Sequence, residues 1–210
     1  MRRVCLLGLV LAIIGAVASP GRATARAAER ADRATAIFAG GCFWCMEVPF
    51  AEEPGVLSVT SGFSGGHKPE PSYDEVSSGG TGHAESVQVI YDPAKVSYTR
   101  LLDIFWHNID PLAKNSQFCD FGTQYRSAIF YRDAAQKAEA EESKRKLEED
   151  KRFTGRIATQ IVAATQFYPA EEYHQHFYKK NPTRYQSYRR GCGRDRRLQE
   201  LWGESAGGHK

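Results

Sequence analysis

The sequence predicts an α/β domain in which a mixed β-sheet and its flanking helices form a two-layer sandwich. Short apolar segments alternate with helix-compatible segments, but without the regular spacing of repeated βαβ units. Two long irregular stretches, 62–82 and 113–125, interrupt this alternation, and loops of this length in compact domains are usually functional. At 210 residues, the chain is long enough for one well-packed domain and an extension.

The individual elements follow from turn residues, helix caps and hydrophobic periodicity. The predicted strands cover 35–39, 56–62, 86–91, 127–131 and 159–163. The predicted helices cover 43–50 before Pro54-Gly55, 97–109 before Pro111, the highly charged segment 133–151, and 170–179 before Asn181-Pro182.

The N-terminus has the layout of a secretory signal peptide. Arg2 and Arg3 precede an apolar stretch, 4–17, which small residues follow. The apolar stretch is short for a membrane span, which needs about 20 residues, so no stable membrane insertion is expected after cleavage. We expect a signal peptide at 1–25, a linker at 26–33, the catalytic domain at 34–205 and a disordered tail at 206–210. An exported chain of this kind is expected in the periplasm, or else secreted.

The charge balance gives no argument for a nucleic-acid partner. Cleavage after Ala25 removes Arg2, Arg3 and Arg22 and no acid, so Lys+Arg fall from 28 to 25 against 25 Asp+Glu. The formal net charge of +3 then becomes zero. A basic cluster near the C-terminus is expected to form a solvated face or helix end. It comprises Arg184, Arg189, Arg190, Arg194, Arg196 and Arg197.

The segment Gly40–Glu47 places a cysteine where a thiolate would be reactive. Its two glycines allow a tight turn between the predicted strand and helix. Cys42 would then lie at a helix N-terminus, where free N–H groups and the helix dipole stabilise an anion. Phe43 and Trp44 add an apolar surface suited to a methyl group. These residue types predict a nucleophile beside a pocket.

Other interpretations of these cysteines remain open from the residues alone. A cysteine is often a small buried hydrophobe, and Cys42-x-x-Cys45 could be half of a zinc site or a thioredoxin-type redox pair. Cys119 and Cys192 stand alone, without a second C-x-x-C or paired histidines, so a closed four-ligand zinc site is poorly supported.

Three further pieces of the irregular stretches carry chemically useful side chains. Glu85 lies at a loop–strand border, Asp120 and Tyr125 share a Gly-containing loop, and Tyr73 lies in the first long loop. Each has an ordinary explanation on its own: a solvated glutamate, a turn-capping aspartate or a packed tyrosine.

Taken together, these pieces resemble the peptide methionine sulfoxide reductase A family over about 36–185. The matching motifs are G-C-F-W-C-M-E, G-F-S-G-G, P-S-Y, T-G-H-A-E-S-V, Y-D-P, F-W-H-N-I-D-P, D-F-G-T-Q-Y-R-S-A-I and F-Y-P-A-E-E-Y-H-Q. Their number and order make chance similarity an inadequate explanation. The resemblance implies a ferredoxin-like core and reduction of methionine S-sulfoxide, protein-bound or free.

The resemblance also assigns roles to matched positions. Cys42 is implied as the nucleophile, and Glu85 as the acid that protonates the sulfoxide oxygen. Asp120 is implied as the acid that supports Glu85. Tyr73 and Tyr125 are implied to hydrogen-bond the sulfoxide oxygen. Phe43 and Trp44 are implied to form the aromatic cradle for the substrate methyl group. No metal or organic cofactor is implied, and the expected reductant is an external, thioredoxin-like dithiol. A monomer is expected.

The resolving cysteine is where the sequence departs from the family pattern. Cys45 replaces a residue that is often glycine, and the tail has Gly191-Cys192-Gly193 with no further cysteine. We expect Cys192 to resolve the sulfenic acid, with Cys45 as the alternative, and Cys119 to be a buried neighbour of the site. Two rival functions remain: a thiol–disulfide oxidoreductase using Cys42-x-x-Cys45 alone, and a periplasmic zinc- or copper-binding protein.

Overall fold

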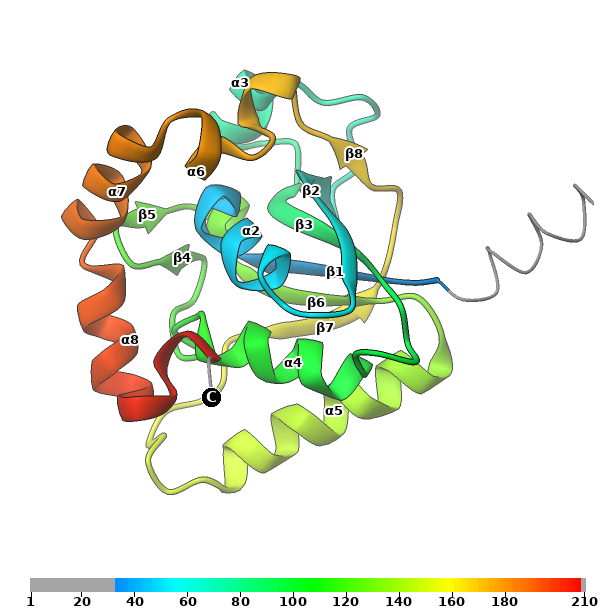
Figure 1. Cartoon of the computed structure of the whole chain (residues 1–210), viewed down its shortest axis with the longest axis vertical. Helices are drawn as coiled ribbons and strands as arrows, with labels where there is room; N and C mark the ends of the chain where they lie inside the picture. Colours follow the sequence, from blue (N-terminus) through cyan, green and yellow to red (C-terminus); the bar gives the residue numbers. More distant parts are fainter. Residues whose placement is uncertain (1–32, 209–210) are drawn as a thin grey trace, which may run out of the picture. The chain divides into compact units, whose positions relative to one another are not determined.

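A computed structural model describes residues 33–208 (Figure 1). Its strands are β1 (Ala34–Gly40), β2 (Val56–Ser64), β3 (Ala84–Tyr91), β4 (Ser116–Gln117), β5 (Asp120–Phe121), β6 (Ser127–Tyr131), β7 (Gln160–Ala163) and β8 (Tyr168–Pro169). Its α-helices are α2 (Phe43–Ala51), α3 (Tyr73–Ser77), α4 (Tyr98–His107), α5 (Ala134–Glu149), α6 (Phe177–Lys180), α7 (Pro182–Gly191) and α8 (Arg194–Trp202). Short 3-10 helices are η1 (Thr123–Tyr125), η2 (Glu172–His174) and η3 (Gly203–Gly208).

The main sheet confirms the predicted mixed α/β architecture. Its strand order is β7-β6-β1-β3-β2-β8, with β6 and β7 parallel and the other neighbouring pairs antiparallel. The inner order β6-β1-β3-β2, with α2 after β1 and α4 after β3, is that of a ferredoxin-like βαββαβ unit. The five strands predicted from sequence are β1, β2, β3, β6 and β7.

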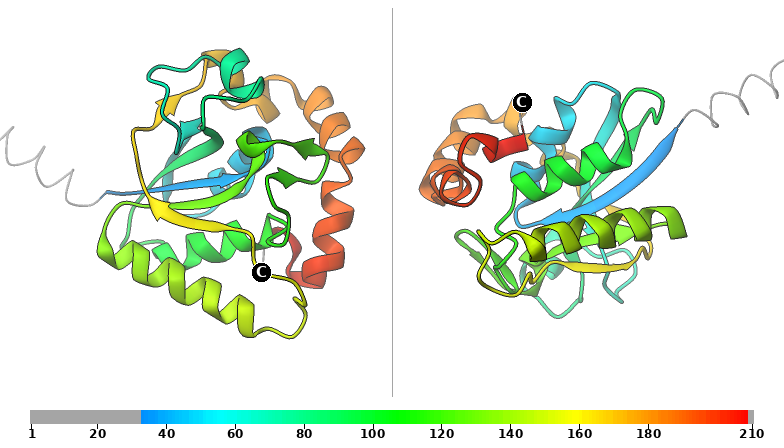
Figure 2. Two further views of the ribbon diagram at one scale, coloured as in Figure 1. Left: turned by 180° about the vertical axis from the view of Figure 1, so that it is seen from behind. Right: turned by 90° about the horizontal axis from the view of Figure 1, so that it is seen from below.

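The larger core lies between one face of this sheet and the helices. Alternation along β1 sends Ala36 and Phe38 to this face and Ile37 and Ala39 to the other. The Phe38 ring stacks on the rings of Phe50 in α2 and Phe105 in α4, and the distances between ring centroids are 5.1 and 5.2 Å. Figure 2 shows helices gathered over this face and loops on the other. The core therefore anchors α2, whose first turn carries the site.

The C-terminal part differs from the predicted single helix at 170–179. His176 adopts a left-handed backbone conformation, with φ of 51°, which separates the short helix α6 from η2. Pro182 then begins α7 at a position where its missing N–H costs nothing. The helices α7 and α8, the hairpin β4–β5 and the short α3 were not predicted.

The sequence led us to expect that the basic cluster forms a solvated face or helix end, but the structure shows that part of it is buried or paired. Arg194 is only 2% exposed, and its guanidinium donates to the Asn108 carbonyl at 2.7 Å and lies 4.4 Å from the centre of the Phe118 ring. Arg189 and Arg197 form ion pairs with Asp195 and Asp110. These contacts fix α8 against the rest of the domain.

The two ends of the chain are described only in part. The predicted signal peptide and all of the predicted linker except Arg33 lie outside the described residues. The tail expected at 206–210 is packed as far as it is described, because the Gly207 carbonyl accepts a hydrogen bond from Asn108 at 2.9 Å. Within 33–208, no helix is both long and apolar enough to cross a membrane.

Candidate active site

The turn from β1 into α2 is the foundation of the site. Gly41 has a φ of 81°, and a side chain there would bring its Cβ to 2.5 Å from that of Gln117. Cys42 is the N-cap of α2, and its carbonyl accepts the Cys45 N–H at 3.0 Å. The predicted strand–turn–helix junction is confirmed, with Cys42 at its helix end.

Glu85 lies beside this helix N-terminus. It comes from β3, pairs in register with Phe63 of β2, and is 2% exposed. Its Oε2 accepts the Phe43 N–H at 3.0 Å, one of the groups that a helix N-terminus leaves without a backbone partner. The carboxyl group predicted to act as the acid is thus held by the backbone N–H of the residue that follows Cys42.

Burial controls the protonation of Glu85. Burial, with smaller contributions from the charges of Asp120 and Cys45, raises the pKa of Glu85 to about 8 against the opposing effect of the Phe43 N–H. An acid with this pKa is mostly protonated near neutral pH. Glu85 is therefore available as a proton donor, which a solvated glutamate would not be.

Cys42 and Cys45 form a close thiol pair, and both are free and buried. Burial raises the pKa of Cys42, contrary to the lowering expected from its position at a helix N-terminus. A hydrogen bond with Cys42, together with the charges of Arg194 and Arg189, lowers the pKa of Cys45 to about 6. The pair therefore shares one proton near neutral pH, and its sulfurs titrate together.

Two tyrosines face the same groups. Tyr73 begins α3, and Tyr125 ends η1; the Gln124 side chain joins these segments by donating to the Ser77 carbonyl at 2.8 Å. Burial, then the charges of Glu85 and Cys42, raise the pKa of Tyr73 to about 12. Burial and Glu85 likewise raise the pKa of Tyr125. Both hydroxyls therefore remain hydrogen-bond donors.

The aromatic cradle has a buried part and a half-buried part. Phe43 is 1% exposed, and its ring packs against Phe63 and Tyr73. Trp44 is half-buried and stacks on Phe177 with ring centroids 3.7 Å apart. Its indole N–H donates to Nδ1 of His174 at 3.1 Å. His174 was missed from sequence, although it lies in the F-Y-P-A-E-E-Y-H-Q motif.

Asp120 approaches the site from the hairpin β4–β5. It is half-buried, and its Oδ2 accepts the hydroxyl proton of Tyr188 at 2.5 Å. Burial raises the pKa of Asp120, whereas Tyr188 and Arg194 oppose the rise. Tyr188 was missed from sequence; its position four residues before Cys192, one helical turn away on α7, is the signal that could have identified it.

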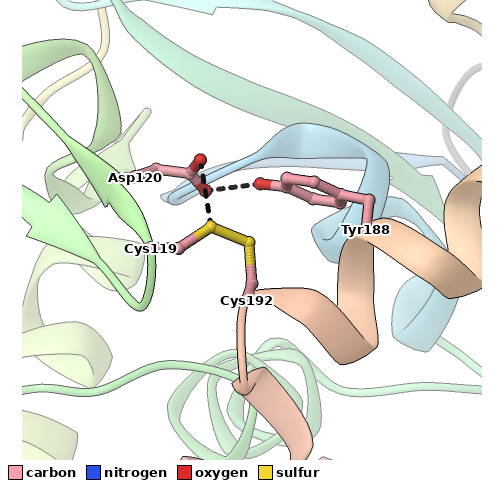
Figure 3. The surroundings of a disulfide bond; sticks show 4 residues. All are labelled: Cys119, Asp120, Tyr188 and Cys192. Carbon is pink, nitrogen blue, oxygen red and sulfur yellow. Dashed lines mark hydrogen bonds between the residues drawn. A yellow bond between two sulfur atoms is a disulfide. The ribbon is translucent and has the colours of Figure 1, made fainter.

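Cys192 is not beside Cys42 but is joined to Cys119 (Figure 3). The disulfide connects the end of α7 to the hairpin that carries Asp120, across 73 residues of sequence. Cys119 is exposed, so the expectation of a buried neighbour is wrong. The free thiol in contact with Cys42 is that of Cys45, the alternative partner, and the choice between Cys192 and Cys45 as the resolving cysteine stays a prediction.

The described residues contain one group of three side chains close enough to hold a metal ion. It consists of Cys119, Asp120 and Cys192, and the disulfide already joins two of the three. The Cys42–Cys45 pair belongs to no such group within 33–208. This geometry gives no support to the zinc- or copper-binding alternative.

The arrangement defines a class of protein: a thiol-dependent oxidoreductase. A nucleophilic sulfur at a helix N-terminus faces a protonated carboxyl group, two tyrosine donors and an aromatic surface. Attack of sulfur on an electrophilic sulfur bound to oxygen needs these donors, because oxygen leaves only when it is protonated.

Comparisons with known proteins identify the family. The sequence profile described as "Peptide methionine sulfoxide reductase" matches residues 34–206. The "Peptide methionine sulfoxide reductase MsrA" of Bacillus licheniformis is 53% identical over 176 residues, which are 84% of this chain and 96% of the relative. The "MsrA 2" of Caulobacter vibrioides is 48% identical over 205 residues, 97% of this chain and 100% of the relative.

Solved structures agree. Reduced Mxr1 of Saccharomyces cerevisiae has a TM-score of 0.69 and 34% identity, over 73% of this chain and 88% of that one. Methionine sulfoxide reductase A of Corynebacterium diphtheriae has a TM-score of 0.65 and 36% identity, over 72% and 76%. The chain belongs to the peptide methionine sulfoxide reductase family. It is an oxidoreductase that reduces methionine sulfoxide.

Proposed function

We propose that the chain reduces the S epimer of methionine sulfoxide by attack of the Cys42 sulfur on the sulfoxide sulfur. The observation that carries this proposal is the placement of Cys42 at the start of α2 beside the buried, protonated Glu85, whose carboxyl group the Phe43 N–H holds. The substrate is oxidised protein or free methionine sulfoxide. Phe43 and Trp44 receive its methyl group.

The proton balance of this step falls to Glu85. As the sulfur–sulfur bond forms, Glu85 donates its proton to the sulfoxide oxygen, while Tyr73 and Tyr125 donate hydrogen bonds to it. Asp120 supports the site from the hairpin. The protonated oxygen then passes from the substrate sulfur to the Cys42 sulfur as the sulfur–sulfur bond breaks, which releases methionine and leaves a sulfenic acid on Cys42.

We assign resolution of the sulfenic acid to Cys45. Its sulfur contacts that of Cys42, and its low pKa of about 6 makes it a thiolate near neutral pH. Its attack on Cys42 forms the Cys42–Cys45 disulfide and releases water, as in redox motifs at helix N-termini. Cys192 is already bonded to Cys119. An external thioredoxin-like dithiol then reduces the new disulfide by exchange.

We further propose that the chain is exported to the periplasm and that its reductant acts there. The support is the sequence pattern of 1–25, with Arg2 and Arg3 before an apolar run. A disulfide such as Cys119–Cys192 is of the kind that persists in oxidising compartments.

One assay tests the activity and its residue together. The purified chain is incubated with each sulfoxide epimer of an N-acetylmethionine amide and a thioredoxin-like dithiol, and methionine release is measured by chromatography. We expect turnover of the S epimer only, and none by Cys42→Ser. Turnover by Cys42→Ser, or disulfide exchange without sulfoxide reduction in the native chain, would overturn the assignment.

A further inference from the structure

Tyr188 is a polar side chain of the site that has no role in the proposed reduction steps. It lies on α7, and its ring meets Trp44 edge-on, with centroids 5.8 Å apart. Its hydroxyl donates to Asp120 Oδ2 at 2.5 Å and lies close enough to the Cys42 sulfur to lower the pKa of that thiol. Figure 3 shows the hydroxyl directed at the Asp120 carboxyl group, next to the Cys119–Cys192 disulfide. The hydroxyl therefore connects the nucleophile to an acid on a different element.

The two contacts of the hydroxyl cannot both be donated bonds, because a phenol has a single proton. When Asp120 is ionised, its carboxylate accepts that proton, as in the observed geometry. When Asp120 is protonated, it donates to the Tyr188 oxygen, and the hydroxyl is free to donate to Cys42. Charge on Cys42 is thus favoured when Asp120 is neutral.

Several groups around Cys42 act on the charge of its sulfur. The groups that act on its charge are Cys45 of α2, Glu85 of β3, Tyr73 of α3, Tyr125 of η1 and Tyr188 of α7, with Asp120 beyond Tyr188. The cations Arg189 and Arg194 act on Cys45 and favour the thiolate there. Among these groups, Tyr188 is the one whose hydrogen bond lowers the pKa of Cys42.

We propose that Tyr188 is a further residue of the reaction: its hydroxyl relays the Cys42 proton to Asp120 and then holds the thiolate. The S–H bond of Cys42 breaks as its proton passes to the Tyr188 oxygen, and the Tyr188 O–H proton passes to Asp120 Oδ2. The total charge of the buried site stays constant, so no further charge has to be desolvated. The proposal rests on the assignment of Cys42 as nucleophile.

The helix that carries Tyr188 is held in place for this task. Cys192, one turn after Tyr188, is bonded to Cys119, the neighbour of Asp120. The Cys119 sulfur lies 3.7 Å from Asp120 Oδ1. The disulfide thereby ties donor and acceptor, which come from α7 and β5, into one unit.

The test measures alkylation of Cys42 by iodoacetamide as a function of pH, which requires no sulfoxide. The full chain carries Cys45→Ser, so that Cys42 titrates alone, and labelling of its peptide is read by mass spectrometry. Tyr188→Phe keeps the ring and removes the hydroxyl, and should raise the midpoint by about one unit. Tyr178→Phe, a tyrosine of α6 whose ring packs on Tyr185, is the matched control and should leave the midpoint unchanged.

The role of Asp120 is tested in the same assay. Asp120→Asn should lower the midpoint, because the amide donates to Tyr188 and frees its hydroxyl for Cys42. The same substitution combined with Tyr188→Phe should have less than half of that effect. An unchanged profile in Tyr188→Phe, or an equal effect of Asp120→Asn with and without the hydroxyl, would overturn the relay. Because the readout is alkylation, absence of sulfoxide reduction would not affect this result.

Discussion

At Glu85, two opposing physical effects decide what the side chain can do. Burial in a nearly water-free position favours the neutral acid, whereas the Phe43 N–H favours the carboxylate. Burial is the larger effect, so the group retains a proton that a solvated glutamate loses. The same N–H fixes the carboxyl group beside Cys42, and one backbone hydrogen bond thus positions the acid without ionising it.

Replacing this acid tests its role directly. Glu85→Gln keeps the shape and an acceptor for the Phe43 N–H but has no proton of suitable acidity. We expect methionine release in a single turnover to slow by about 10²–10⁴-fold, the usual contribution of a general acid. Stopped-flow mixing with the sulfoxide measures it. A rate within a factor of two of the native chain would show that the proton comes from elsewhere.

The pKa of about 8 also predicts how rate and stability depend on pH. The acid form is required, so single-turnover release should fall as pH rises through about 8, and this limb should be absent in Glu85→Gln. The folded pKa is raised above the unfolded value of 4.5, so the stabilisation from the proton is complete below about 4.5 and is lost as pH rises towards 8. Urea unfolding across this range should show native stability falling relative to Glu85→Gln. Parallel curves would contradict the assignment.

At the scale of elements, the cysteines separate into two pairs with different positions. Cys42 and Cys45 share the first turn of α2, whereas Cys119 and Cys192 join a hairpin to the end of α7. Local sequence spacing could predict the first pair, because residues three apart on a helix are neighbours. The second pair depends on how α7 packs, which no local pattern of this sequence encodes.

The division of the cysteines into these two pairs predicts which cysteine supports recycling of the enzyme. Cys45→Ser should release about one methionine per enzyme and then stall with a thioredoxin-like reductant, leaving a sulfenic acid on Cys42. Cys192→Ser should continue to turn over. Mass spectrometry of dimedone-treated enzyme measures the sulfenic acid. The opposite outcome, with Cys192→Ser stalled and Cys45→Ser recycling, would restore Cys192 as the resolving residue.

The second disulfide should instead contribute to stability. Closing a loop with 73 residues of sequence separation stabilises a fold by about 2–4 kcal/mol through the unfolded chain. We expect Cys119→Ser and Cys192→Ser each to lower the free energy of unfolding by such an amount in chemical denaturation. Cys45→Ser is the control, since Cys45 is a free thiol. Unchanged stability in both disulfide variants would contradict this expectation.

For the molecule as a whole, the sequence predicted the sheet better than the C-terminal wrapping. Strands such as β1 and β3 are apolar runs bounded by turn residues, and this local pattern is sufficient to predict them. Arg194 was misjudged because its burial depends on the Asn108 carbonyl and the Phe118 ring, which come from distant segments. Tyr188 was missed for the same reason, since Asp120 is 68 residues away in sequence. Local spacing does not reveal the partners in such long-range polar contacts, although the four-residue spacing of Tyr188 and Cys192 could have drawn attention to Tyr188.

The N-terminal segment leads to a prediction for the chain in the cell. If 1–25 is a signal peptide, the mature protein starts near Arg26 and loses Arg2, Arg3 and Arg22. Its Lys+Arg count then equals its Asp+Glu count, at 25 each, and the charge that drives export is absent from the working enzyme. Expressed in a bacterium with two membranes, the chain should appear in the periplasmic fraction.

N-terminal sequencing of that fraction checks the cleavage. Replacing Arg2 and Arg3 by glutamate should retain the full chain in the cytoplasm, because a positive segment before the apolar run directs insertion. The same replacement should leave the activity of the purified protein unchanged, since the described domain begins beyond the segment. Recovery of uncleaved, cytoplasmic native chain would instead show that these residues are retained, and the reductant would then be a cytoplasmic dithiol.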